Sequence, residues 1–153
     1  LGTFIRNAVE QRRGARVRLW DFRRELWKAM ELLQMERTYG DRDLNVGFSG
    51  GEKKKAEILQ MLLLKPGLAI LDETDSGLDV DAVRTVSKGV EEYQKDRNGG
   101  LLIITHSTRI LEALRVDKTH IMIDGRIVKT GGASLVEEIN KNGFEQYLEQ
   151  ADR

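Results

Sequence analysis

Two acidic side chains follow directly on a short apolar run in the middle of the chain. The run covers residues 68–71, and the acidic pair is Asp72 and Glu73. An aspartate just past a buried strand can hold a magnesium ion through water, and the next residue points elsewhere and can orient or deprotonate an attacking water. Helix capping, or a turn with a stray acidic pair, is the alternative that these two residues leave open.

A second apolar run, residues 101–105, ends at His106. The carboxyl ends of parallel strands meet at one edge of a sheet, and α/β nucleotide enzymes bind their ligands there. We therefore expect Asp72, Glu73 and His106 to share that edge. His106 by itself also fits a structural histidine that is hydrogen-bonded at a strand end.

A third candidate is Ser49-Gly50-Gly51-Glu52, which opens a predicted helix. Unpaired amides and the positive end of the helix dipole can receive a phosphate group there, the glycines permit close backbone approach, and the serine hydroxyl can bond a phosphate oxygen. The same four residues also form a good capping box. The lysines at positions 53–55 are predicted to form a solvated helix face.

Helices and strands alternate from Ser49 onward. A helix from Gly50 to about Leu64 must end before Pro66. The apolar runs predict buried parallel strands at 68–71 and 101–105. Amphipathic spacing predicts helices over 79–96, 107–114, 134–140 and 144–150, and a hairpin of 120–123 and 126–129 turns at an Asp-Gly pair. The fold class is α/β.

The first 39 residues have apolar side chains at helical spacing, which predicts two helices joined near Gly14. Turn-forming residues at 41–48 then predict a linker. The arginines between the helices form either a solvated face or a docking surface for an acidic partner. They are Arg12, Arg13, Arg16, Arg18, Arg23 and Arg24.

Composition excludes several classes of function. The 153 residues include 25 basic and 25 acidic side chains, so no long-range field attracts nucleic acid or an anionic membrane. No apolar run approaches the roughly 20 residues that span a bilayer, and we expect no membrane insertion. With no cysteine and two histidines, the chain has neither a disulfide framework nor the ligands of a typical zinc site.

In this order, the motifs resemble those of the ABC-type ATPases, whose fold is a P-loop NTPase core with an α-helical subdomain. Residues 48–52 resemble the signature motif, 68–73 the Walker B strand, 76–79 the D-loop, and 103–106 the switch segment. The resemblance implies ATP and Mg²⁺ as cofactors. It implies catalytic roles for Glu73 and His106, metal binding by Asp72, and nucleotide binding by Ser49, Gly50, Gly51, Glu52 and Asp79.

Within that superfamily the chain is similar to SufC, the ATPase of the Suf iron-sulfur cluster assembly system. The signature ends in Glu52 where transporters usually have glutamine, and transporters more often show a proline near Thr74 and an alanine near Gly77. This resemblance implies a cytoplasmic ATPase that works with SufB- and SufD-like scaffold proteins and forms a homodimer with ATP bound. Residues 1–48 would be the helical subdomain and linker, and 49–153 the signature helix and the C-terminal half of the core.

The sequence departs from the family's pattern, because the adenine-stacking aromatic residue and the Q-loop glutamine that precede the helical region in this family are missing. It contains no Gly-x-x-x-x-Gly-Lys-Ser/Thr, so the loop that cradles the nucleotide phosphates is missing. We expect the C-terminal part of a longer ATPase, inactive by itself, in which Asp72 and Glu73 act on nucleotide in cis and Ser49 reaches nucleotide in trans. Two alternatives remain: an ABC transporter subunit docked to membrane helices, and a non-catalytic binding module with vestigial ATPase motifs.

Overall fold

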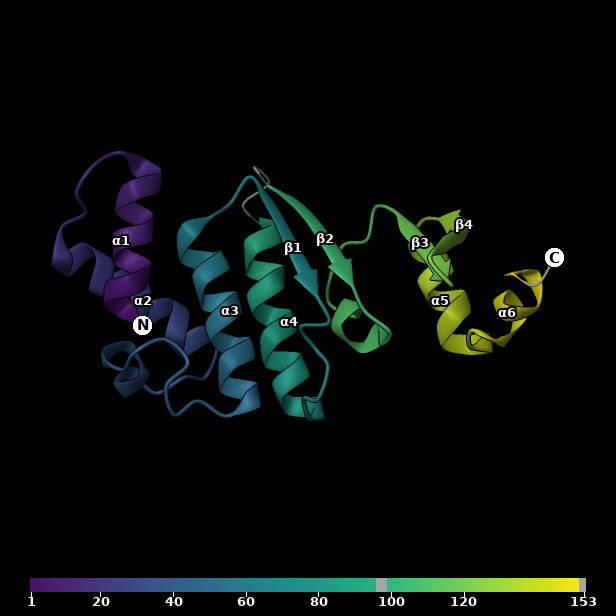
Figure 1. Cartoon of the computed structure of the whole chain (residues 1–153), viewed down its shortest axis with the longest axis horizontal. Coiled ribbons are helices and arrows are strands. Elements are labelled where there is room, and N and C mark those ends of the chain that lie inside the picture. The colour runs from purple at the N-terminus through teal and green to yellow at the C-terminus, as the bar shows by residue number, and fades with distance from the viewer. Residues whose placement is uncertain (96–98, 152–153) are drawn as a thin grey trace. The chain divides into compact units, whose positions relative to one another are not determined.

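The computed structural model describes residues 1–95 and 99–151. The chain divides into two compact units, Leu1–Ala113 and Leu114–Arg153, and each has its own elements (Figure 1). The boundary at residue 48, expected between helical subdomain and core, lies inside the first unit and stays a prediction.

The first unit opens with two helices, as the apolar spacing predicts. They are α1 (Gly2–Arg13) and α2 (Leu19–Leu32), and Gly14 ends α1 in a left-handed conformation. Glycine adopts that backbone without the cost that a β-carbon brings, which explains its place at the helix end. A short 3₁₀ helix, η1 (Arg37–Asp41), follows α2.

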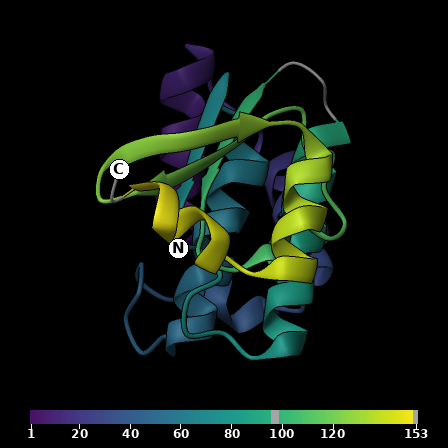
Figure 2. The ribbon, with the colours of Figure 1, turned by 90° about the vertical axis from the view of Figure 1, so that its right-hand side faces the viewer.

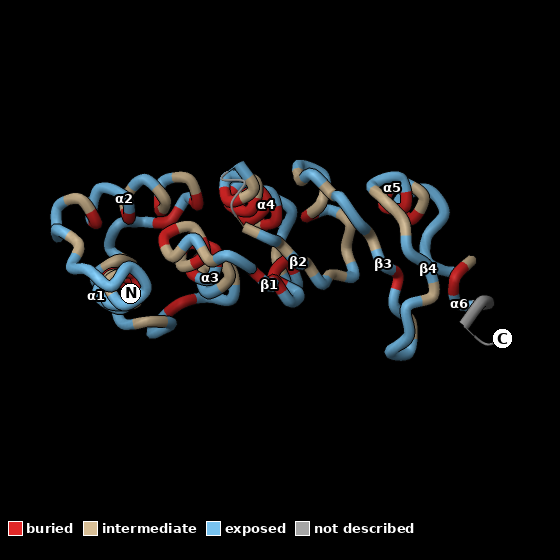
Figure 3. Tube along the Cα trace, turned by 90° about the horizontal axis from the view of Figure 1, so that it is seen from above, coloured by how far each residue is buried: buried red, intermediate tan, exposed pale blue. Residues whose placement is uncertain are grey.

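Helix α3 (Gly50–Leu64) is the centre of this unit. It begins at the Ser49 cap and ends at Lys65, directly before Pro66. It contacts α1, α2 and α4 (Val80–Lys95), and Figure 3 shows buried positions gathered on α3 and α4. Helix α4 confirms the predicted helix over 79–96, except that Asp96 lies outside the described residues.

Strands β1 (Leu68–Asp72) and β2 (Gly100–Ile104) pair in parallel, with α4 as the crossover between them. The pairing is as predicted, but burial differs between the two faces. Ala69 and Leu71 are buried, whereas Leu68 and Ile70 on the other face are 60% and 59% exposed. An apolar run alone cannot show this difference, because it fits burial on one face or on both.

The helix predicted over 107–114 is wrong: the structure has only a short 3₁₀ helix there, η2 (Thr108–Leu111). Ser107 begins it and accepts a hydrogen bond through Oγ from the Arg109 amide, two residues on. Such local side-chain bonds compete with the longer-range ladder of an α-helix. The segment is anchored by Ile110, which is fully buried.

The second unit contains the predicted hairpin, β3 (Thr119–Ile123) and β4 (Arg126–Gly131), and two helices, α5 (Ala133–Asn142) and α6 (Glu145–Ala151) (Figure 2). Asp124 and Gly125 have φ angles of 48° and 76°. Two successive positive φ angles are what a type I′ turn requires, so the turn prediction is confirmed. The core of this unit consists of Ile121, Leu135, Ile139 and Tyr147.

The exposed face of the two-stranded sheet generates a prediction about association. Ile70 and Leu102 pair in register on it and are 59% and 48% exposed. We expect this apolar face to make the chain self-associate and bind a hydrophobic dye. Replacing both residues with threonine, which keeps strand propensity, should reduce dye fluorescence and the sedimentation coefficient together.

Val46→Thr is the matched control, because Val46 is 62% exposed and lies outside the sheet. It should change neither quantity. A wild-type chain that stays monomeric at high concentration, unfolds cooperatively and binds no dye would contradict the prediction.

Candidate functional site

The carboxyl edge of the parallel sheet brings the predicted residues together. Asp72 ends β1 and is in register with Ile104, the last residue of β2. Glu73 and His106 each lie just beyond, and His106 Nδ1 is 3.6 Å from Glu73 Oε1. Both side chains are more than half exposed. The structure therefore places a carboxylate beside an imidazole at an edge that is open to a ligand.

Glu73 has an unusual backbone conformation for a non-glycine residue. Its φ angle is 47°, in the left-handed region, and its amide donates to the Ile104 carbonyl at 2.8 Å. This bond extends the pairing of the strands by one residue, and the chain then turns. The acidic pair consequently belongs to two backbone environments, because Asp72 is still in the strand and Glu73 is in the turn.

A buried carboxylate, to which no feature of the sequence pointed, supports this edge. Asp75 is only 6% exposed, and the Thr105 hydroxyl lies 3.0 and 2.9 Å from its two oxygens and donates to it. The same hydroxyl accepts from the Ser107 amide and lies 2.9 Å from the Ser107 carbonyl. These contacts bind the turn after Glu73 to both residues that flank His106.

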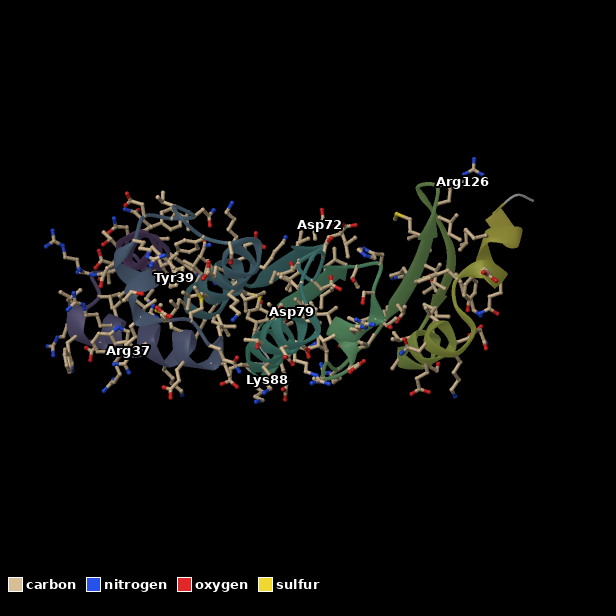
Figure 4. The ribbon with its side chains drawn as sticks, turned by 90° about the horizontal axis from the view of Figure 1, so that it is seen from below. Arg37, Tyr39, Asp72, Asp79, Lys88 and Arg126 are labelled. Carbon is tan, nitrogen blue, oxygen red and sulfur yellow. The ribbon has the colours of Figure 1, made fainter. Side chains whose placement is uncertain are left out.

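Asp79 serves as a helix cap in the structure. Its Oδ1 accepts from the Ala82 amide at 2.7 Å, and its carbonyl accepts from the Val83 amide. Asp79 is exposed, and Figure 4 shows it together with Asp72. Capping engages only one of the two carboxylate oxygens, Oδ1. The expected contact of Asp79 with nucleotide stays a prediction.

The structure confirms the capping box at the start of α3. The Glu52 amide donates to Ser49 Oγ at 3.3 Å, and the Ser49 amide donates to Glu52 Oε2 at 2.7 Å. A β-carbon added at Gly50 would meet no heavy atom within 4 Å, and one at Gly51 would lie 3.7 Å from Leu78 Cδ2, an ordinary contact. Neither glycine has a positive φ angle. The fold of this chain alone thus gives no reason for the two glycines.

A second residue that the sequence did not point to is Tyr39 of η1, which is labelled in Figure 4. Its hydroxyl donates to Glu52 Oε1. That bond and the Ser49 amide lower the pKa of Glu52 to about 2, and the pKa of Tyr39 is raised by the same bond. No sequence signal identified Tyr39, because an aromatic residue near the end of a helical region is usually part of the core.

The lysines at positions 53–55 lie in the first turns of α3. Lys53 is exposed, as the predicted solvated face requires, whereas Lys54 and Lys55 are half-buried. Lys54 Nζ is 3.6 Å from Glu57, and Lys55 donates to the Gln34 carbonyl. Within residues 1–95 and 99–151, no three metal-ligating side chains gather into a metal site. Over the same residues, no helix is both long enough and apolar enough to cross a membrane.

Comparison with known proteins finds relatives that are 45–50% identical to this chain over most of its length. The chain is 45% identical over 144 residues to vegetative protein 296 of Bacillus subtilis, covering 93% of this chain and 55% of that protein. It is 50% identical over 124 residues to a probable ABC transporter ATP-binding protein of Streptococcus pyogenes, covering 81% and 48%. A probable ATP-dependent transporter of Cyanophora paradoxa is 49% identical over 116 residues, covering 76% and 44%. The chain spans about half the length of these curated relatives.

Solved structures agree on the fold. An ATP-binding cassette of an ABC transporter matches with a TM-score of 0.63 at 23% identity, over 86% of this chain and 50% of that one. A dimeric bacterial ABC transporter cassette matches with a TM-score of 0.66 at 13% identity, over 84% and 55%. No family model matches the sequence. The chain has the α/β fold of an ABC ATPase cassette, and it has homologues among ABC transporter ATP-binding proteins.

The buried Asp75 pair generates a stability prediction. Thr105→Val keeps the shape of the side chain but removes the hydroxyl that donates to Asp75. Leaving a buried carboxylate without this donor should lower the free energy of unfolding by roughly 1–3 kcal/mol, measured by denaturant titration.

Thr85→Val is the matched control. Thr85 is also buried, at 4%, but its hydroxyl donates to the Asp81 carbonyl inside α4, an acceptor that the helix already uses. Thr85→Val should lower the free energy of unfolding clearly less than Thr105→Val does. Equal losses in the two variants would show that the Asp75 contact adds nothing beyond an ordinary threonine bond.

Proposed function

We propose that this chain, which has the fold of an ABC ATPase cassette, supplies the acidic edge and the signature motif of a site that binds and hydrolyses ATP. The observation that carries the proposal is the placement of Glu73 beside His106, with 3.6 Å between Glu73 Oε1 and His106 Nδ1. Asp72 and Ile104 are the paired ends of the parallel strands; Glu73 comes one residue after Asp72, and His106 comes two residues after Ile104. A base and a donor at an open sheet edge are suited to a phosphoryl transfer to water.

Each residue has a distinct role in this mechanism. The Glu73 carboxylate accepts a proton from the attacking water and orients it. His106 donates a hydrogen bond to the γ-phosphate, where negative charge grows in the transition state. The Asp75 and Thr105 contacts hold the two loops that carry these groups.

Asp72 fits a magnesium ion. Mg²⁺ is held by one or two carboxylates together with waters and substrate phosphates, and Asp72 is an exposed carboxylate at the strand end. When bound, the ion would supply positive charge that offsets the negative charge of the phosphates.

The two glycines at the start of α3 support an approach from outside the chain. Neither packing nor backbone conformation requires Gly50 or Gly51 to lack a side chain. Close approach of a phosphate to a helix N-terminus does require it. We propose that Ser49, Gly50 and Gly51 contact nucleotide held by a second subunit, and the match to a cassette described as dimeric supports this arrangement.

The phosphate-cradling loop is expected on another stretch of polypeptide. The sequence lacks its motif, and the chain spans about half the length of its curated relatives. We therefore propose that this chain has no turnover by itself. Reading the encoding gene upstream of Leu1 tests the expected place of the loop, because a strand followed by Gly-x-x-x-x-Gly-Lys-Ser/Thr must be found there.

Two partners are compatible with the site. The comparisons favour a subunit of an ABC transporter, because relatives with that description are 50% identical to this chain over 124 residues. The residue pattern Glu52, Thr74 and Gly77 supports a SufC-like ATPase acting with SufB- and SufD-like scaffold proteins in the cytoplasm. Copurification separates the two, because a membrane permease supports the first and a soluble scaffold the second.

The catalytic assignment predicts a specific loss. In a longer protein that carries the phosphate-cradling loop, Glu73→Gln should abolish steady-state ATP hydrolysis and preserve ATP binding, because an amide keeps the shape but cannot take the proton. His106→Ala should also reduce turnover at saturating ATP. Glu137→Gln, the same change at an exposed position of α5, is the control. Turnover of Glu73→Gln within a few-fold of wild type would remove Glu73 from its role.

The arginine-rich stretch predicts where the partner docks. Arg16, Arg18 and Arg23 are exposed on and before α2. Reversing all three to glutamate should weaken partner binding in a salt-sensitive manner and spare nucleotide affinity. Reversing Lys88, Lys118 and Arg126, three exposed cations elsewhere, is the control. Unchanged partner affinity at low salt would leave the stretch as a solvated face.

A further inference from the structure

We infer that Tyr39 is a positioning residue for the signature segment at the start of α3: it holds one oxygen of Glu52 while the other oxygen stays on the Ser49 amide. The inference rests on the proposed function, since that function makes the signature segment the phosphate-contacting part. It adds a residue from η1, ten positions before Ser49, to the machinery of the site.

The two Glu52 oxygens have separate donors. Oε1 accepts from the Tyr39 hydroxyl, and Oε2 accepts from the Ser49 amide at 2.7 Å. A carboxylate accepts at both oxygens, whereas glutamine has one accepting oxygen and one donating amino group. With a glutamine here, the amino group would take the place of one oxygen, and the Tyr39 hydroxyl would have to accept instead of donate to keep its contact. Glutamate lets the Tyr39 hydroxyl and the Ser49 amide each donate to an oxygen of its own.

Tyr39 is itself held in place by two side chains. Its ring meets Phe48 edge-on at 4.9 Å between centroids, and the Arg42 guanidinium lies 4.2 Å over the ring. Phe48 is buried at 7% exposure and directly precedes Ser49. The tyrosine therefore contacts the signature segment at two points, the ring of Phe48 and the carboxylate of Glu52.

The contact has a consequence for phosphate binding. The first amides of a helix have no partner within the helix, and they are the groups that would receive a phosphate. Glu52 is ionised at neutral pH, as an unperturbed glutamate would be, and donation from Tyr39 and Ser49 lowers its pKa further, to about 2. Because both oxygens are hydrogen-bonded, the Glu52 carboxylate does not turn toward the incoming anion. Loss of the Tyr39 hydroxyl would release one charged oxygen close to it.

Tyr39→Phe tests the inference, because it removes the hydroxyl and keeps the ring with its Phe48 and Arg42 contacts. The first measurement uses this chain and follows the Glu52 carboxyl carbon and the Ser49 amide by NMR. In the wild type, the Glu52 signal should not titrate between pH 6 and 3.5. In Tyr39→Phe the pKa of Glu52 should rise so that it titrates in this window, and Ser49 amide exchange should speed up about tenfold.

Tyr147→Phe is the matched control. Tyr147 donates to Glu138 at 2.6 Å in the second unit, so the same change removes the same kind of bond elsewhere. It should leave Glu52 and Ser49 as in the wild type. If Tyr39→Phe also left both unchanged, the inference would be overturned.

The second measurement uses the longer protein that carries the phosphate-cradling loop. Tyr39→Phe should lower kcat about tenfold and leave the KM for ATP within about twofold, because the signature acts on nucleotide already held by the other subunit. A raised KM with unchanged kcat would overturn the positioning role. A wild-type protein without turnover would overturn the proposed function, and the NMR measurement would then decide the Tyr39–Glu52 contact by itself.

Discussion

The parallel pairing of β1 and β2 is the constraint on which the candidate site depends. Parallel strands must be joined by a crossover, here α4, and their carboxyl ends then lie at one edge. Asp72 and Ile104 are opposite each other, so the residues that follow them, Glu73 and His106, are neighbours despite their separation in sequence. An antiparallel arrangement of the same two strands would place these two residues at opposite ends of the sheet.

Polar contacts join the two loops beyond this edge. The buried Asp75 accepts from Thr105, and Thr105 accepts from the Ser107 amide, so one hydroxyl joins the two loops. At the start of α3, Glu52 joins Tyr39 to Ser49 in a similar way. In both places a carboxylate and a hydroxyl set the position of residues that are themselves exposed. Exposed groups can meet a ligand, and buried or engaged groups hold them in place.

The start of α3 shows that capping and anion binding are not competing explanations. The capping box engages Ser49 Oγ as an acceptor and Glu52 Oε2, Tyr39 engages Glu52 Oε1, and the serine hydroxyl proton stays able to donate. The cap thus explains Ser49 and Glu52. It does not explain Gly50 and Gly51, whose missing side chains serve no contact within the chain. The glycines rather than the serine are therefore the stronger sign of an external ligand.

The sequence by itself determined the helices α1 to α4, the two parallel strands and the Asp-Gly hairpin turn, because these follow from apolar periodicity and from residues such as Gly14, Pro66 and Gly125 that restrict the backbone locally. It also placed Asp72, Glu73 and His106 at one sheet edge, since strand direction fixes that edge. Only the tertiary structure decided that η2 is a short 3₁₀ helix and that Leu68 and Ile70 are on the exposed face of the sheet. It alone also identified Asp75, Thr105 and Tyr39. Those three act through hydrogen bonds between residues 13 and 30 positions apart, and neither periodicity nor local propensity carries information on which distant donor reaches which carboxylate.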